Sequence, residues 1–348
     1  MSGQPDRQGV AGILIAGPWV AWWPWQEGCG ETELDDGVAG GRLMLLVQQA
    51  INGVMLGAVY VTMAVAFTLT IGVLNFLNFT IPALFMVAGM VGWSLVTNGL
   101  PFGLVGHLHW APALLIGIGC AVVLSVVIEQ LSYRFLKARH GDATEHAIPL
   151  VSSLGFLLII ENLVRVRFGT DMRAFASPFQ GISWNLGGIL ISIPQLASLV
   201  LSLLTVFGLS ALLRGSKVGR AIRAIAENPE AAAVVGVDVR KIVPVVFAAT
   251  GLLCGLAAAI YALNYGEVAP SMGDDIGTKA IAGMVLGGLG SIWGAIAGGL
   301  LVGLTEAFSI QLFGSDAIQA SVWGLLLLVM ILRPQGLFGH SAIGKGKF

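Results

Sequence analysis

Residues 43–79 read LMLLVQQAINGVMLGAVYVTMAVAFTLTIGVLNFLNF and contain no charged side chain. Asp, Glu, Lys and Arg stay absent until Glu129. A stretch of this length without charge cannot supply the polar surface of a soluble fold, whereas each helix that faces lipid needs about 20 apolar residues. The sequence therefore predicts an all-α, polytopic membrane protein.

The composition of the whole chain agrees with this class. Only 11% of the 348 residues are charged, whereas soluble domains carry about a quarter. The 48 glycines are typical of transmembrane helices that pack through small residues. A net charge of -1 argues against a nucleic-acid partner.

Motifs of catalysis are missing from the sequence. The three cysteines have neither metal-ligand nor disulfide-framework spacing. No GxxxxGK[ST], HExxH or GxSxG pattern occurs. We therefore expect no catalytic residue, cofactor or metal site in this chain.

Eight apolar regions follow Arg42. They are 43–74, 81–97, 111–133, 148–164, 189–213, 242–263, 279–312 and 318–332. At 1.5 Å per residue the first and seventh exceed one hydrocarbon core of about 30 Å. Each of these two is expected to be broken or to form a hairpin, so the chain would cross the membrane eight to ten times, with some helices broken or re-entrant.

The two ends of the chain differ from this core. Residues 1–42 combine a Trp-rich run, interrupted by Pro18 and Pro24, with an acidic run. We expect this segment to be a disordered extension, with a poor signal-like segment as the alternative. The membrane domain would then span 43–339, followed by a cytoplasmic tail at 340–348.

The charges in the loops orient the helices. Basic residues accumulate in cytoplasmic loops, so the 214–241 segment and the basic tail are placed inside. The acidic loop 267–275 is placed outside. A chain that passes from this outside loop to the inside tail crosses the membrane an odd number of times. Region 318–332 supplies one crossing, so region 279–312 must cross twice or not at all. A hairpin or re-entrant half-helix fits best, with its turn in GGLGSIWGAIAGG, residues 287–299.

The 214–241 segment holds nine of the 37 charged residues of the chain. In its first half Arg220, Arg223 and Glu227 recur at helical spacing and leave Ala221, Ala224 and Ile225 on another face. This pattern predicts an amphipathic helix on the membrane surface.

A second short helix is predicted directly afterwards. Asn228 is a favoured N-cap, Pro229 suits the first helical position, and Glu230 lies where the helix dipole favours an anion. Gly236 ends the helix as a residue able to take positive φ. The small apolar side chains favour docking against a protein, whereas a helix bound to lipid headgroups typically carries larger ones.

The stretch ENPEAAAVVGVD resembles the EAA loop of ABC-transporter permeases through Glu230, Ala231, Ala232 and Gly236. With GRAIRAIAENPEAAAVVGV it is similar in particular to membrane subunits of LIV-type branched-chain amino acid importers, which include urea and amide relatives. Four further stretches agree with that family: 52–79, 154–171, 285–299 and 333–339. The resemblance covers residues 43–339.

The resemblance implies a permease subunit of an ATP-driven importer in a bacterial inner membrane. It implies a second homologous permease, two cytoplasmic ATPases and a periplasmic substrate-binding protein as partners, beside the lipid bilayer. The residues implied to couple to the ATPases are Arg220, Arg223, Glu227, Asn228, Pro229, Glu230, Ala231, Ala232 and Gly236. Relatives usually have a polar Ala-His-Gly-acidic motif where this chain has Thr80, Ile81, Pro82 and Ala83.

Some residues are candidates for the translocation pathway or for helix packing. Glu306 is an acid within an apolar region, which marks it as a functional candidate. Asn52 and Asn78 are the other two pathway candidates. Five glycines are assigned to helix packing: Gly287, Gly288, Gly290, Gly294 and Gly298.

Two other classes of function remain as alternatives. A stand-alone secondary transporter or channel would place ionisable groups in the middle of the membrane. The first membrane segments contain none. An intramembrane enzyme, the third hypothesis, needs a convergent nucleophile or metal cluster, for which the sequence offers no pattern.

Overall fold

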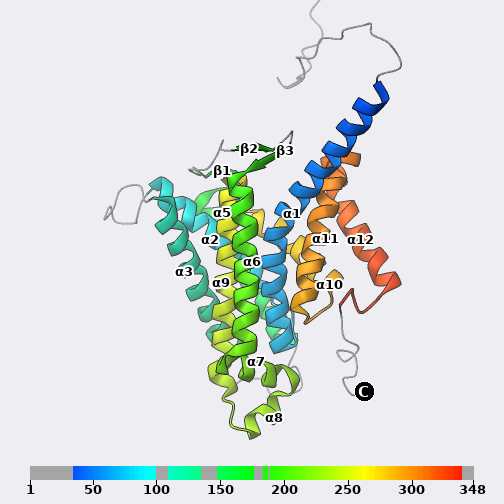
Figure 1. The fold of residues 1–348 in the computed structure, drawn as a ribbon. Helices are drawn as coiled ribbons and strands as arrows, with labels where there is room; N and C mark the ends of the chain where they lie inside the picture. The colour runs from blue at the N-terminus through cyan, green and yellow to red at the C-terminus, as the bar shows by residue number, and fades with distance from the viewer. Residues whose placement is uncertain (1–33, 99–108, 135–146, 176–182, 187–188, 339–348) are drawn as a thin grey trace, which may run out of the picture. The chain divides into compact units, whose positions relative to one another are not determined.

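The computed structural model describes residues 34–98, 109–134, 147–175, 183–186 and 189–338. The chain divides into two units, Met1–Leu43 and Met44–Phe348. The second unit is a helical bundle (Figure 1). The elements in chain order are α1 (Leu34–Leu74), α2 (Thr80–Asn98), α3 (Trp110–Ile128), the π-helix η1 (Glu129–Arg134), α5 (Ala147–Phe168), β1 (Arg173–Ala174), β2 (Ser183–Leu186), β3 (Ile189–Ser192), α6 (Ile193–Gly215), α7 (Lys217–Glu227), α8 (Pro229–Val234), α9 (Val239–Tyr265), β4 (Glu267–Val268), α10 (Met272–Gly287), α11 (Ile292–Phe313), the 3-10 helix η3 (Ser315–Ala317) and α12 (Ile318–Leu332).

Eight helices of the described residues are long and apolar enough to cross a membrane. They are α1, α2, α3, α5, α6, α9, α11 and α12. This number and the few short strands confirm the prediction of a polytopic all-α membrane protein. The eighth span joins η3 to α12 and covers Ser315–Leu332, 18 residues. α10, with 16 residues, is shorter than each of these spans.

The first apolar region differs from its prediction. Region 43–74 was expected to be broken or to form a hairpin, but α1 is one continuous helix. A helix longer than the hydrocarbon core can tilt or extend beyond it, so length alone does not require a break. The same helix begins at Leu34, ahead of the expected start of the membrane domain at residue 43. Residues 1–33 and the tail 340–348 lie outside the described residues.

The seventh apolar region forms the expected hairpin. α10 and α11 are joined by a turn at 288–291, where Gly288 and Gly290 have positive φ of 107° and 82°. The helices approach so closely that a Cβ at Gly298 would meet the Gly283 carbonyl oxygen. A Cβ at Gly287 would likewise meet the carbonyl oxygen of Gly294. Small residues thus permit backbone contact between the two helices.

The C-terminal segment folds back on this turn. Leu337 and Phe338 donate backbone hydrogen bonds of 2.9 Å to the carbonyl oxygens of Leu286 and Gly287. The described parts of the two Gly-rich stretches that resembled family signatures, 285–299 and 333–338, are therefore neighbours in space.

The core of the second unit surrounds α1. Most of the apolar part of α1 is buried, whereas Val322 is the one buried residue of α12. Interhelical hydrogen bonds cross the core, for example between the Thr62 and Ser202 hydroxyls at 2.9 Å and between those of Thr70 and Thr250 at 3.1 Å. Buried hydroxyls of this kind join helices where no water is available to them.

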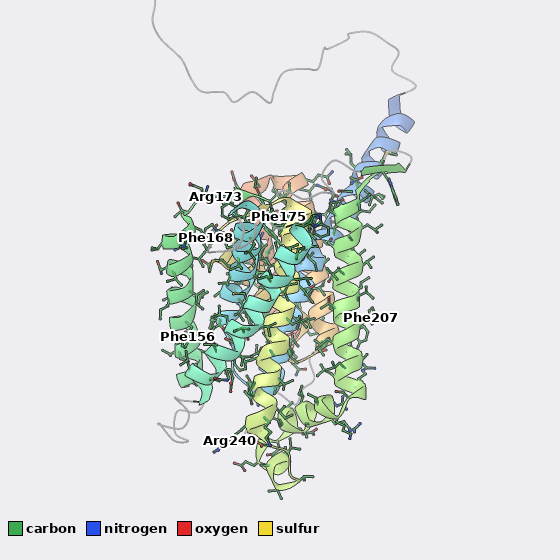
Figure 2. All side chains as sticks on the ribbon, turned by 90° about the vertical axis from the view of Figure 1, so that its left-hand side faces the viewer. Phe156, Phe168, Arg173, Phe175, Phe207 and Arg240 are labelled. Carbon is green, nitrogen blue, oxygen red and sulfur yellow. The ribbon has the colours of Figure 1, made fainter. Side chains whose placement is uncertain are left out.

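The bundle has two distinct ends (Figure 1). One end carries α7 and α8 and is called the loop end. The opposite end carries the antiparallel pairs β1–β4 and β2–β3 and is called the strand end. Figure 2 shows Arg240 at the loop end and Arg173 at the strand end, with Phe156 and Phe207 between them. The two labelled arginines thus lie at the ends of the bundle and the two labelled phenylalanines along its length.

Candidate functional site

The loop end contains the two short helices expected from the sequence. α7 begins after Ser216, whose hydroxyl oxygen accepts a 2.8 Å hydrogen bond from the Gly219 amide. α8 begins after Asn228, whose side-chain oxygen accepts from the amides of Glu230 and Ala231, both at 3.0 Å. The predicted N-cap is thus confirmed.

α8 ends at a tight backbone motif. The Val237 amide donates to the Ala232 carbonyl oxygen and the Gly236 amide donates to that of Ala233, both at 3.0 Å. Gly236 has a φ of 92°. This pair of bonds is a Schellman motif, in which glycine avoids the steric cost of the left-handed region. The predicted role of Gly236 in ending the helix is therefore confirmed.

The buried face of α7 differs in part from the prediction. Ile225 is buried as expected, but Ala224 is exposed. The buried face consists of Gly219, Ile222 and Ile225. A Cβ at Gly219 would meet the carbonyl oxygens at the end of α6, so α7 turns tightly against α6. The contact with α6, which periodicity alone does not reveal, selects this face.

Arg223 helps to hold that turn. Its guanidinium donates to the Leu213 carbonyl oxygen at the end of α6. A cation suits the negative end of the helix dipole. Arg223 therefore orients α7 on α6. Arg220, Glu227 and Glu230 are exposed, as is the Arg223 side chain itself.

The outer surface of α8 is apolar and exposed. The exposed fraction is 88% for Val234 and 84% for Val235. Ala231 and Ala233 are exposed beside them, while Ala232 is buried. This small, rigidly capped surface projects from the loop end into an aqueous region, where apolar side chains favour contact with a partner.

The next helix is also capped by a charged side chain. The Asp238 carboxylate accepts from the Arg240 amide at 3.1 Å and lies 3.2 Å from the Lys241 ammonium. The hydrogen bond from Lys241 holds the pKa of Asp238 below its ordinary value. The charges of this loop thus act locally, on helix ends.

A second charged group lies inside the bundle. The Glu306 carboxylate of α11 accepts from the Lys279 ammonium of α10 at 2.7 Å. Its other oxygen accepts from the Tyr60 hydroxyl of α1 at 2.6 Å. Lys279 also approaches that hydroxyl at 3.3 Å. We call these three residues the buried cluster.

The buried cluster lies at membrane depth. Glu306 is 14 residues from the start of α11 at Ile292, and Tyr60 is 14 residues from the end of α1 at Leu74. At 1.5 Å per residue both lie about 21 Å from the loop end of their helices. That depth is within a hydrocarbon core of about 30 Å. An isolated charge there is costly, which explains why the acid and the base are paired.

Glu306 was identified from the sequence, whereas Lys279 and Tyr60 were missed. A signal for Lys279 existed. Between Thr278 and Phe313, Lys279 and Glu306 are the charged residues, and the predicted hairpin places them on neighbouring arms. Nothing in the sequence marks Tyr60, because its contact spans 246 positions.

The other pathway candidates make no hydrogen bond to this cluster among the described residues. The Asn52 amide donates to the Gln49 side chain at 3.1 Å on the same helix. Asn78 is buried, and its side-chain oxygen caps α2 through the Thr80 amide at 3.0 Å. The structure therefore assigns local contacts to both asparagines and brings neither to Glu306.

The segment that departs from the resembled family packs against α10. A Cβ at Gly277 would lie 2.6 Å from the Pro82 ring, and one at Gly273 would lie 2.6 Å from the Pro82 carbonyl oxygen. Pro82 thus makes a close contact with these two glycines, which precede Lys279 on α10 by two and six residues. The apolar replacement at this position serves helix packing.

A further ion pair lies on α5. The Glu161 carboxylate pairs with Arg165 one turn away. In the described part of the chain, no group of three His, Cys, Asp or Glu side chains is arranged to hold a metal ion.

Comparisons with known proteins relate this architecture to transport. The branched-chain amino acid permease BraD of Pseudomonas aeruginosa is 31% identical, over 86% of this chain and 97% of its own length. LivH of Escherichia coli K12, a permease of the same description, is 28% identical over 87% of this chain and 99% of its own. The ribose import permease RbsC of Bacillus subtilis is 27% identical over 71% and 80%. No solved structure matches the chain significantly.

Residues 49–332 also match a family described as branched-chain amino acid transport system / permease component. The matched range begins inside α1 and ends with α12, so it includes the buried cluster, α7 and α8. With this match across the bundle and a relative above 30% identity along nearly its whole length, the chain belongs to the permease-component family of branched-chain amino acid transport systems.

Proposed function

We propose that this chain is one permease subunit of an ATP-driven importer that moves branched-chain amino acids across a bacterial inner membrane. The observation that carries the proposal is the match to BraD and LivH over nearly their whole lengths. The eight apolar helices supply a membrane-spanning scaffold. ATP hydrolysis is assigned to separate subunits.

The α7–α8 loop is the proposed docking site for the ATPases. Its helices are short, capped at both ends and held to α6 by Arg223. The exposed Val234 and Val235 offer an apolar contact, and the surrounding charges keep that surface in water. A rigid projection transmits a movement of its partner to α6 and α9, which flank it.

The strand end is the proposed site for a periplasmic binding protein. Asp274 and Asp275 lie in the first turn of α10, near β1 and β4. A second homologous permease subunit would complete the pathway within the membrane. The loop end would then face the cytoplasm.

Single-cysteine labelling tests this orientation. Ser271 and Ala233 are exposed near opposite ends of the bundle, and Cys29, Cys120 and Cys254 can be removed first. We expect an impermeant thiol reagent to reach a cysteine at Ser271 from the periplasmic side and one at Ala233 from the cytoplasmic side. The opposite pattern would invert the proposed topology.

Reconstitution tests the activity. The chain is co-expressed with the ATPase, permease and binding-protein genes of its neighbourhood, and uptake of radiolabelled leucine into proteoliposomes is followed. We expect uptake that requires both ATP and the binding protein.

One observation favours the alternative of a secondary transporter. The Lys279–Glu306 pair is an ionisable group at membrane depth, as secondary transporters use for coupling. Leucine uptake by the chain alone, driven by an ion gradient without ATP, would establish that alternative in place of the importer.

A further inference from the structure

The buried cluster is built asymmetrically around Glu306. One carboxylate oxygen is held by the Tyr60 hydroxyl at 2.6 Å, and Tyr60 is 1% exposed and belongs to the central helix α1. The other oxygen is held by Lys279 at 2.7 Å. Glu306 therefore keeps a fixed partner even when Lys279 moves away, so its second oxygen can exchange one cation for another.

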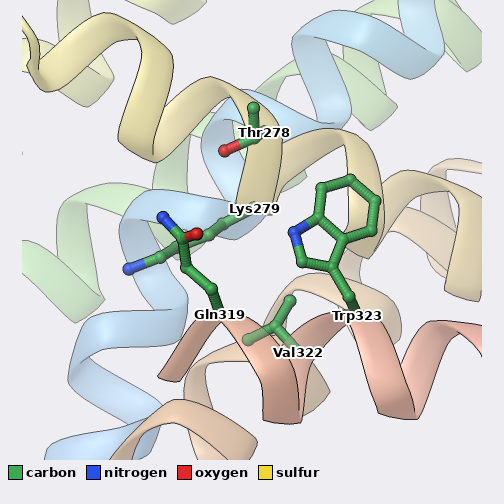
Figure 3. Close-up of a pocket in the computed structure, with 5 residues that line it drawn as sticks. All are labelled: Thr278, Lys279, Gln319, Val322 and Trp323. Atoms are coloured by element: carbon green, nitrogen blue, oxygen red, sulfur yellow. The ribbon is translucent and has the colours of Figure 1, made fainter. Parts of the chain in front are cut away.

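Lys279 is the more accessible member of the pair. Its side chain is 17% exposed, against 8% for Glu306. It lines a pocket of about 100 Å³ together with Thr278, Gln319, Val322 and Trp323. Figure 3 shows the Gln319 amide beside the Lys279 side chain, with the Trp323 ring on the other side of Val322. The pocket thus joins a charged wall from α10 to amide and apolar side chains from α12.

These side chains are chemically complementary to a free amino acid. An amino acid with an uncharged side chain carries one carboxylate and one ammonium group at neutral pH and has no net charge. In a medium of low dielectric constant, each of these charges needs an opposite charge and hydrogen bonds. Lys279 and Glu306 supply one of each at hydrogen-bonding distance from one another.

We propose that Lys279 and Glu306 form a transient site for the zwitterionic headgroup of an amino acid. The substrate carboxylate takes the place of Glu306 at the Lys279 ammonium, and the substrate ammonium takes the place of Lys279 at the free oxygen of Glu306. Tyr60 keeps Glu306 in position, and Val322 and Trp323 contact the apolar side chain. No charge is left unpaired during this exchange, and the Lys279–Glu306 ion pair forms again when the substrate leaves.

This inference rests on the proposed function and names residues that recognise its substrate class. A purely structural ion pair is the competing explanation. The two differ in one respect: a structural pair can be replaced by apolar side chains without loss, whereas a zwitterion site requires both charges.

The experiment compares two double variants in the reconstituted importer. Lys279→Met/Glu306→Leu removes both charges, and Lys279→Glu/Glu306→Lys exchanges them. Leucine uptake is measured for each, with membrane insertion and co-purification of the ATPases as controls for assembly. We expect both variants to assemble, the neutral variant to lose uptake by a factor of about 30 or more, and the exchanged variant to retain more uptake than the neutral one.

A matched variant, Glu161→Gln, removes a carboxylate that is 8% exposed, as that of Glu306 is, but whose partner Arg165 is 40% exposed. It is expected to transport as the unaltered chain does. Normal uptake by the neutral variant, or its failure to assemble, would overturn the inference and assign the pair to structure. Absence of leucine uptake by the unaltered importer would instead contradict the proposed function, so the two failures are distinguishable.

Discussion

The α7–α8 loop and the buried cluster use the same kinds of residue in opposite environments. In the loop the Lys241 and Asp238 side chains are 83% and 48% exposed, whereas Lys279 and Glu306 are 17% and 8% exposed. Water solvates the first pair, so its attraction is weak and its partners are replaceable. The second pair is removed from water, so either charge without its partner would destabilise the fold. The charged residues of the loop thus keep the α7–α8 surface in water, and those of the bundle fix the contact between α10 and α11.

Removal of one charge should give the largest difference in stability between the two regions. Glu306→Leu leaves Lys279 without its carboxylate, and we expect a loss of about 3–5 kcal/mol in the free energy of unfolding. The variant should melt earlier in detergent or disappear from the membrane. Asp238→Asn in the loop is the matched control and should leave the melting temperature unchanged. Equal melting temperatures for both variants would show that the buried pair is solvated.

Substitutions on α8 should affect assembly without affecting the bundle. Gly236→Glu places a side chain and a charge at a left-handed position, and Glu230→Lys reverses the charge in the first turn. We expect near-normal insertion, weakened co-purification of the ATPase subunits and loss of ATP-dependent uptake. The measurement is a pull-down beside vesicle uptake. Full transport by both variants would exclude the loop as a docking site.

A milder pair of variants isolates the backbone effect at Gly236. An added Cβ meets no atom within 4 Å at either Gly236 or Gly215, but only Gly236 of the two has positive φ. Gly236→Ala should therefore cost roughly 1 kcal/mol in α8 stability, whereas Gly215→Ala should cost nothing. Amide hydrogen exchange of α8 measures the difference. Equal protection in the two variants would contradict the Schellman ending.

The N-cap of α8 should have a comparable, local effect. Asn228→Ala removes the acceptor for two amides, and we expect α8 to lose about 1 kcal/mol. Faster amide exchange confined to α8, with an unchanged melting temperature of the bundle, is the expected result. A lowered melting temperature would mean that the loop and the bundle unfold together.

The smallest effect is expected for the N-terminal unit. A chain that begins at Met44 removes that unit and keeps every residue of the loop and the buried cluster. We expect insertion and leucine uptake equal to those of the full chain, measured side by side. Loss of either would make the first 43 residues a topogenic element.

Much of the fold was predictable because its signals are local. Hydropathy along the chain placed the spans, since each must bury about 20 residues in lipid. Asn228, Pro229 and Gly236 placed the ends of α8, since capping involves backbone groups within a few residues. The hairpin at 279–312 followed from loop charges, which are also local properties.

Local patterns did not predict which face each helix buries or which distant residues it contacts. The sequence by itself determined that the chain is a bundle of apolar helices with a capped surface loop and an acid at Glu306. Only the tertiary structure decided that α1 runs unbroken through the core, that Gly219, Ile222 and Ile225 form the buried face of α7, and that Glu306 meets Lys279 and Tyr60. Those contacts join residues up to 246 positions apart, and they depend on how helices rotate and pack against each other, which no local pattern encodes.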